Sequence, residues 1–254
     1  MNAGLAALGD HDFFLVLNPD LVLLDTTTLS RTVRAAVELD DVGIVSPSYV
    51  DADGNRVSFF TDLPLARRYW RWVRPPTAFL RESLSQGPIE VEWMPGAFFL
   101  LPASVARRLG PMDERIFLYA EDADWCHRAR LQGRRNWLLG DLTVFHAWGH
   151  AADGDRRRRV VQTHLGRLHF VKVHSSRAGY AFVLVLMLLE SLLKAAGEVL
   201  QTRRNWSRAK GYLDLARLLP LAAKHSPTYA QNEYWPHLSN EGLVDPGGER
   251  HSAA

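Results

Sequence analysis

The chain has 254 residues, of which 47% are hydrophobic and 23% charged. This composition fits one or two globular domains and excludes collagen-like, low-complexity and wholly disordered chains. The net charge of +2 conceals an asymmetry, since residues 1–150 carry −4, residues 151–225 carry +9 and residues 226–254 carry −3. The single cysteine, Cys126, excludes an intramolecular disulfide, and no signal-peptide pattern opens the chain, so a reducing, cytoplasmic location is expected.

The first 60 residues alternate between strand and helix patterns. The apolar run at 13–17 predicts a buried strand, which ends at the turn Asn18-Pro19-Asp20. Residues 26–39 predict a helix, 42–45 a second strand, and 48–60 a hairpin around Asp-Gly-Asn. The helix is expected to bury one apolar face, made of Leu29, Val33, Ala36 and Val37.

The same alternation continues to residue 150. Residues 89–101 have strand propensity broken by Pro95-Gly96, residues 103–109 predict a short helix, residues 121–133 a longer one, and residues 138–145 another strand. This pattern predicts an α/β architecture with a parallel or mixed sheet. Ligands of such sheets gather beyond the carboxyl ends of strands, where the turn at 18–20 and His146 are expected.

The segment 151–225 predicts basic helices without strands. Its run 180–189 is apolar for ten residues, too short to cross a bilayer, and indicates either a buried core helix or one lying in a membrane interface. The residues that favour the interface are Arg177, Lys194, Arg203, Arg204, Trp206, Arg208 and Lys210. The arginines at 156–159 indicate a solvated face or an anionic partner, and residues 226–254 predict a disordered tail.

Four acidic residues are candidates for chemistry. Asp20 can be a Mg²⁺ ligand or an ordinary turn residue. Glu121 and Asp122 begin a helix, where crowded like charges raise each other's pKa as a general base requires, although acids there also stabilise the helix dipole. Asp124 is expected to pair with Arg128 one turn later.

His146 and His150 have the spacing of a helical metal pair, but the strand-like run before them and Gly149 argue against a helix. A histidine at a strand end can ligate a metal or serve as a hydrogen-bonded packing residue. Both functions therefore stay open for His146.

Three stretches resemble inverting family 2 glycosyltransferases with the GT-A fold, and most closely their rhamnosyltransferase-like branch. The matching stretches are FFLVLNPDLVL, VEWMPGAFFLLPASVARRLGPMDERIFLYAEDADWCHRARLQG and VFHAWGHA. The resemblance covers about residues 2–150, which implies a partial GT-A-like mixed sheet with flanking helices, followed by the helical segment.

The resemblance also implies site residues. Asp20 would bind Mg²⁺ or Mn²⁺ at the donor diphosphate, with Asn18 in place of the first aspartate of the DxD motif and His146 completing the metal site. Glu121-Asp122 would supply the catalytic base, with Asp122 favoured. The residues that would contact the donor sugar or the acceptor are Asn18, Trp93, Gly96, Ala97, Asp124 and Arg128.

The family's opening strands, which bind the nucleotide, have no counterpart in this chain. We therefore expect either a glycosyltransferase, or part of one, that moves a sugar such as rhamnose from a nucleotide diphosphate, or a non-catalytic remnant that binds a partner chain or a membrane. The enzyme would use a glycan or polyprenyl-linked acceptor for cell-surface polysaccharide at the inner face of the plasma membrane. Nucleic acid is a less favoured partner of the arginine run.

Overall fold

One mixed sheet of six strands organises the first part of the structure. The structure is a computed structural model, which describes residues 1–51, 53–57, 63–69, 87–116, 118–147, 156–200, 206–228 and 230. The strands are β1 (Phe13–Leu17), β2 (Leu21–Leu23), β3 (Val42–Val50), β4 (Pro88–Val91), β5 (Phe98–Pro102) and β6 (Arg135–His146). Their order is β1-β5-β3-β6-β2, and β4 also pairs with β6. The mixed sheet expected from the sequence is confirmed.

The direction of the strands brings three carboxyl ends to one edge of the sheet. β5 is antiparallel to both β1 and β3, so β1 and β3 run the same way, and β6 is parallel to β3. The residues that follow β1 and β3 therefore lie at the same edge as the end of β6. The start of β5, which is antiparallel to these strands, lies there too.

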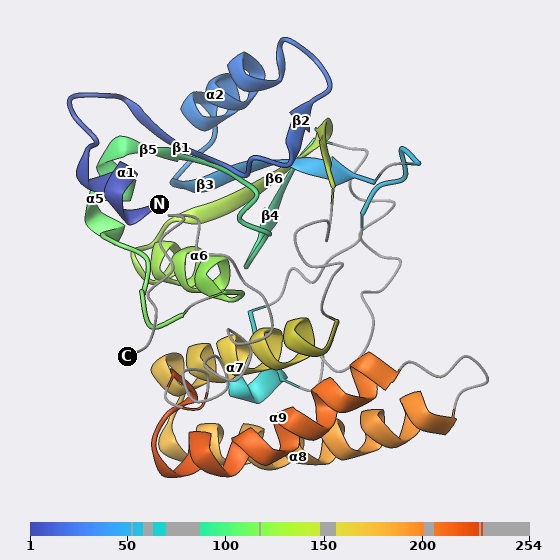
Figure 1. Cartoon of the computed structure of the whole chain (residues 1–254). Coiled ribbons are helices and arrows are strands. Elements are labelled where there is room, and N and C mark those ends of the chain that lie inside the picture. Colours follow the sequence, from blue (N-terminus) through green and yellow to red (C-terminus); the bar gives the residue numbers. More distant parts are fainter. Residues whose placement is uncertain are drawn as a thin grey trace, which may run out of the picture.

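Helices cover both faces of the sheet (Figure 1). They are α1 (Asn2–Ala6), α2 (Thr28–Glu38), α5 (Ala103–Leu109) and α6 (Glu121–Leu131), with a short 3₁₀ turn η1 (Ala66–Arg68). Figure 1 shows α2 on one face and α6 on the other. The core between them includes Trp125 and Cys126 of α6, both fully buried, and burial raises the pKa of the Cys126 thiol.

The predicted apolar face of α2 is confirmed for Ala36, which is buried, and for Val33, which packs against the core, but it is wrong for Leu29 and Val37. The helix buries Thr28, Thr32 and Ala36, while Val37 is 70% exposed and Leu29 is exposed as well. Thr32 is accommodated because its hydroxyl donates to the Thr28 carbonyl at 2.8 Å within the helix. A hydroxyl satisfied within its own helix can be buried, and the pattern of apolar residues alone does not reveal this.

Three long helices form a second layer beneath α6 (Figure 1). They are α7 (Arg156–His174), α8 (Arg177–Leu200) and α9 (Trp206–Lys224), which pack through an apolar core of their own. Gly166 lets α7 approach the turn before α6, because a Cβ at Gly166 would lie 2.2 Å from the Tyr119 carbonyl oxygen. No helix in the described part of the chain is long and apolar enough to span a bilayer.

Several predictions concern residues outside the described ranges. This group comprises His150, Arg203, Arg204, all residues after 230 and part of the predicted hairpin. The described part of the hairpin is consistent with a turn, since the Gly54 amide donates to the Asp51 carbonyl at 3.0 Å and Val50 bridges Arg56.

Candidate active site

The carboxyl edge of the sheet brings Asp20 and His146 together. Leu21 at the start of β2 pairs with His146 at the end of β6, which places the preceding Asp20 beside the imidazole. Asp20 Oδ1 lies 3.3 Å from His146 Nε2, with side chains 34% and 9% exposed. The sequence did not predict β2, the strand that creates this pair.

The pair fits a divalent cation whose other ligands come from elsewhere. Two neighbouring ligands of an octahedral ion, each at about 2.1 Å, are about 3 Å apart, close to the separation of these two atoms. Mg²⁺ commonly takes only one or two protein carboxylates and completes its shell with water and phosphate oxygens. Among the described residues, no group of three or more His, Cys, Asp or Glu side chains is arranged to hold a metal.

The segment before β5 connects this pair to α6. The Asn18 amide donates to the Ala97 carbonyl at 2.9 Å, and the amide of the neighbouring Gly96 donates to Asp122 Oδ2 at 3.2 Å. A Cβ at Gly96 would lie 3.1 Å from Asp122 Cβ, so the absence of a side chain permits this approach. The predicted residues Asn18, Gly96, Ala97 and Asp122 are therefore adjacent.

Tyr49 of β3 holds the segment before β5 in place, although the sequence did not predict a role for it. Its buried hydroxyl donates to the Pro95 carbonyl at 2.9 Å and accepts from the Phe98 amide at 3.2 Å. Its ring centroid lies 6.0 Å from that of His146. The residue belongs to β3, where an aromatic side chain is indistinguishable in sequence from an ordinary core residue.

Asp122 has the environment of a general base. Burial raises the pKa of its carboxyl group, while the amides of Ala123 and Gly96 and the Trp93 side chain moderate the increase. The Ala123 amide donates to Oδ1 at 2.8 Å, so both carboxylate oxygens are fixed in position. A carboxylate with a raised pKa and a fixed orientation meets two requirements of a general base.

Glu121 points to a different part of the molecule. It lines a cavity of about 370 Å³ with Met1, Asn2 and Glu114, whereas Asp122 faces Gly96. Burial first, and then the charge of Asp122, raises the pKa of Glu121 to about 8. The repulsion predicted from the sequence is thus the second cause of the shift at Glu121.

Asp124 and Arg128 hold α6 in place. Asp124 is 4% exposed, and its two oxygens contact Arg128 Nε and His174 Nε2, each at 2.8 Å. Although burial alone would raise the pKa of Asp124, the His174 hydrogen bond and the Arg128 charge hold it below its usual value. The ion pair agrees with the helical spacing, whereas His174 lies 50 residues away on α7 and carries no sequence signal.

A turn with left-handed backbone precedes the two acids. Tyr119 and Ala120 have φ angles of 67° and 79°, which side-chain-bearing residues rarely adopt. Such conformations persist where the surrounding structure imposes them, and they are frequent at functional sites. Here Gly166 of α7 packs against this turn.

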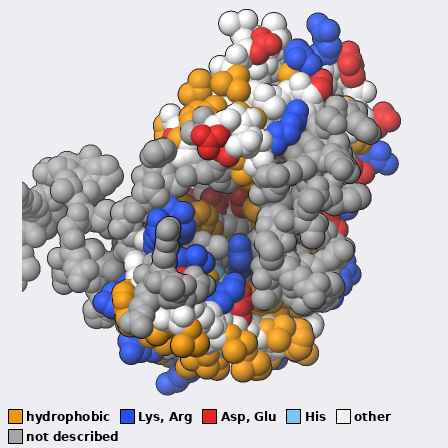
Figure 2. Space-filling view, turned by 90° about the vertical axis from the view of Figure 1, so that its right-hand side faces the viewer, with side chains coloured by type: hydrophobic (Ala, Val, Ile, Leu, Met, Phe, Trp, Pro, Cys, Tyr) orange, Lys and Arg blue, Asp and Glu red, His pale blue; other side chains and the backbone are white. Residues whose placement is uncertain are grey.

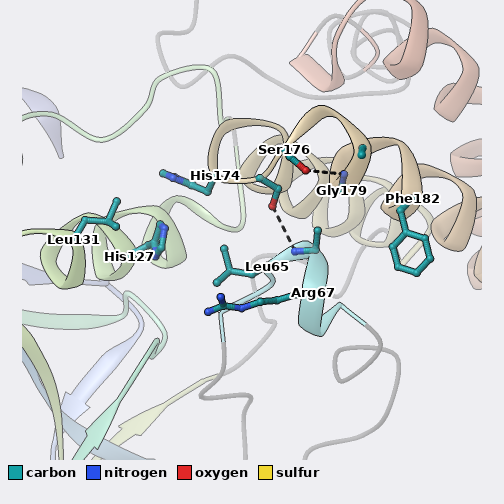
Figure 3. Close-up of a pocket in the computed structure, with 11 residues that line it drawn as sticks. Leu65, Arg67, His127, Leu131, His174, Ser176, Gly179 and Phe182 are labelled. Atoms are coloured by element: carbon teal, nitrogen blue, oxygen red, sulfur yellow. Dashed lines mark hydrogen bonds between the residues drawn. The ribbon is translucent and has the colours of Figure 1, made fainter.

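A further cavity, of about 780 Å³, is lined by residues of α6, of η1 and of the junction between α7 and α8 (Figure 3). His127 and Leu131 of α6 face His174, Phe182 and Arg67 across it. Burial, followed by the His174 charge, lowers the pKa of His127 to about 4, so this imidazole is neutral at physiological pH. None of the predicted site residues is among the described residues that line this cavity.

Comparison with known proteins identifies distant relatives. No family model matches the chain. It is 27% identical over 165 residues to the N-acetylglucosaminyl-diphospho-decaprenol L-rhamnosyltransferase of Mycobacterium tuberculosis, in both strain CDC 1551 and strain H37Rv. The chain is thus a distant relative of rhamnosyltransferases. The match covers 60% of this chain and 52% of each relative, so the chain spans about half the length of these curated relatives.

The similarity supports kinship with glycosyltransferases at the level of the enzyme class. The mixed sheet with flanking helices is compatible with such a fold. The roles of the individual site residues stay predictions.

Proposed function

We propose that the chain is a metal-assisted glycosyltransferase of family 2 with a GT-A-like fold, or part of one. It would transfer a sugar such as rhamnose from a nucleotide diphosphate to a polyprenyl-linked glycan. The observation that supports this most is the adjacency of the Asp20–His146 pair to Asp122 through Asn18, Ala97 and Gly96. The acceptor class is taken from the names of the two distant relatives.

Asp122 and the Asp20–His146 pair have different functions in the proposed reaction. Asp122 accepts the proton of an acceptor hydroxyl while that oxygen forms a bond to the anomeric carbon and the bond from this carbon to the diphosphate breaks. The nucleotide diphosphate leaves with the electron pair of the broken bond. Asp20 and His146 would hold Mg²⁺ or Mn²⁺, which supplies positive charge at the departing diphosphate. Asn18, Trp93 and Ala97 would line the donor and acceptor positions.

Transfer of radiolabelled rhamnose from its nucleotide diphosphate to N-acetylglucosaminyl-diphospho-polyprenol tests this function. We expect product with Mn²⁺ or Mg²⁺ and none with a chelator. Asp20→Asn should raise the metal concentration needed for half-maximal transfer by about tenfold, because a neutral amide is a weaker ligand for hard cations. Asp40→Asn, which changes an exposed carboxylate after α2, is the matched control and should leave this concentration unchanged.

An Asp20→Asn variant with unaltered metal dependence would reject the metal assignment. A chain that binds vesicles but forms no product with any donor tested would support the alternative function, a non-catalytic protein that binds a partner chain or a membrane.

We further infer that α8 rests on a membrane surface, where a polyprenyl-linked acceptor would lie. After Arg177, every exposed position of α8 is apolar, and the large ones are Phe182, Val185, Leu189, Leu192, Leu193 and Leu200. The neighbouring α9 exposes Trp206, Lys210, Leu213, Arg217 and Lys224 at helical spacing. Figure 2 shows the apolar side chains at the lower end of the molecule, with Lys and Arg beside them. An apolar face bordered by cations matches an anionic lipid surface.

Cosedimentation with phosphatidylglycerol vesicles tests the membrane contact. The double substitution of Leu189 and Leu193 by Glu should lower vesicle binding at least about tenfold, because burial of one leucine contributes about 1.5 kcal/mol or more. Val37→Glu, on the exposed face of α2, should not change it. The inference fails if the unmodified chain does not bind these vesicles, or if it is a dimer that the α8 substitutions convert to monomers.

A further inference from the structure

A basic pocket lies between the three long helices. It is a cavity of about 460 Å³ to which α7, α8 and α9 all contribute. The cationic residues that line it are Arg156, Arg159, Arg167, Lys194 and Arg208. They come from three separate helices, so the pocket is more than the exposed surface of the arginine run at 156–159.

The lining of the basic pocket carries net positive charge. Glu190 accepts from Lys194 Nζ at 2.5 Å, and Glu198 pairs with Arg208 Nε at 3.1 Å. Among the described residues that line the pocket there is no carboxylate, and Tyr212 adds a hydroxyl group to the lining. An excess of cations in a concave site produces a positive field, which favours an anion.

Helix α7 links the basic pocket to α6, the helix that carries the candidate base Asp122. Gly166 packs against the turn that precedes Glu121, and the next residue, Arg167, lines the pocket. Arg167 is close enough to both Asp122 and Glu190 for their charges to interact. Figure 2 shows a recess between the sheet layer and the helical layer, with acidic side chains on its upper wall and Lys and Arg on its lower wall.

We infer that the basic pocket binds a diphosphate group, namely the one that joins the acceptor sugar to its lipid. Arginine donates paired, charge-assisted hydrogen bonds to phosphate oxygens, and three arginines here come from one helix. The donor's own diphosphate is the other source of this chemistry, but the Asp20–His146 pair lies at the sheet edge beside Asn18 and serves that group. The inference rests on the proposed function for the identity of the acceptor.

Calorimetric titration without any transfer reaction tests the inference. The probes are inorganic pyrophosphate, geranyl diphosphate as a short prenyl diphosphate, and a nucleoside diphosphate. Arg208→Gln should weaken the binding of pyrophosphate and geranyl diphosphate about tenfold, or about 1.4 kcal/mol. Arg217→Gln is the matched control, because it removes an α9 cation that is 80% exposed, pairs with Asp214 at 3.8 Å and lies outside the pocket. This variant should bind all three probes as the unmodified chain does.

The outcomes of these titrations distinguish the acceptor diphosphate from the donor diphosphate as the ligand of the basic pocket. Weaker binding of geranyl diphosphate in Arg208→Gln, and in the second pocket variant Arg159→Gln, supports the inference. Absence of pyrophosphate binding, or equal losses in Arg208→Gln and Arg217→Gln, overturns it. Weaker binding of the nucleoside diphosphate alone assigns the pocket to the donor and overturns the acceptor assignment. Because no transfer is measured, a failure here differs from a failure of the Asp20 test.

Discussion

Asp122→Asn is expected to reduce sugar transfer by about 10²- to 10⁴-fold, the range attributed to a positioned general base. Asparagine keeps the shape of the side chain, but its single oxygen can accept from only one of the Gly96 and Ala123 amides, and it cannot accept the proton. The free energy of unfolding should change by no more than about 1–3 kcal/mol, because the loss of one hydrogen bond to a backbone amide opposes the gain from removing a carboxylate whose charged form is disfavoured by burial. Steady-state rates at saturating donor and acceptor measure the effect.

The neighbouring acid supplies the control for this substitution. Glu121→Gln alters a carboxyl group that faces the cavity near Met1 rather than Gly96, and we expect less than about a tenfold change in rate, well below the range for a base. Transfer by the unmodified chain should also decline as the pH falls through the raised pKa of Asp122, since protonation removes the base. A larger loss in Glu121→Gln than in Asp122→Asn would exchange the two roles.

Gly166→Ala is expected to destabilise the folded chain strongly. The added Cβ would lie 2.2 Å from the Tyr119 carbonyl oxygen and 3.1 Å from that of Leu118, and both are backbone atoms that cannot rotate away. Either α7 moves outward or the left-handed turn before α6 changes, and overpacking of this kind costs about 1–3 kcal/mol or more. Urea unfolding followed by circular dichroism measures the loss.

The matched control for Gly166→Ala lies on the next helix. A Cβ at Gly197 of α8 meets nothing within 4 Å, so Gly197→Ala should stabilise the chain by about 0.5–1 kcal/mol through the higher helix propensity of alanine. If both variants unfolded at the same urea concentration, the close packing of α7 against the Tyr119–Ala120 turn would be refuted.

The sequence was sufficient to predict the positions of helices and strands that have a clear local pattern. The strand at Phe13–Leu17 and the helices at Ala103–Leu109 and from Glu121 onward agree with their predicted positions, because apolar runs and glycine or proline stops define them. β2 was missed because three residues after a turn carry no measurable periodicity. The buried face of α2 was predicted only in part, because two of its buried residues, Thr28 and Thr32, are threonines.

Part of the candidate site also followed from local pattern. The placement of Asp20 and His146 at strand ends could be predicted, and β2 then determined their separation. Tyr49, His174 and Arg167 could not be predicted, since each reaches the site from an element whose position depends on tertiary packing. The division of Glu121 and Asp122 between two sides of α6 likewise required the neighbours of each carboxyl group.

Cys126 has a practical consequence for measurement. It is the only cysteine in the sequence, it is fully buried in α6, and its thiol is held in the protonated form. Maleimide reagents attack thiolates that solvent can reach, so the native chain should remain unlabelled. A cysteine introduced at the exposed Ser207 of α9 would then carry a fluorophore at one defined position, from which energy transfer to labelled lipids could report the orientation of the helical layer.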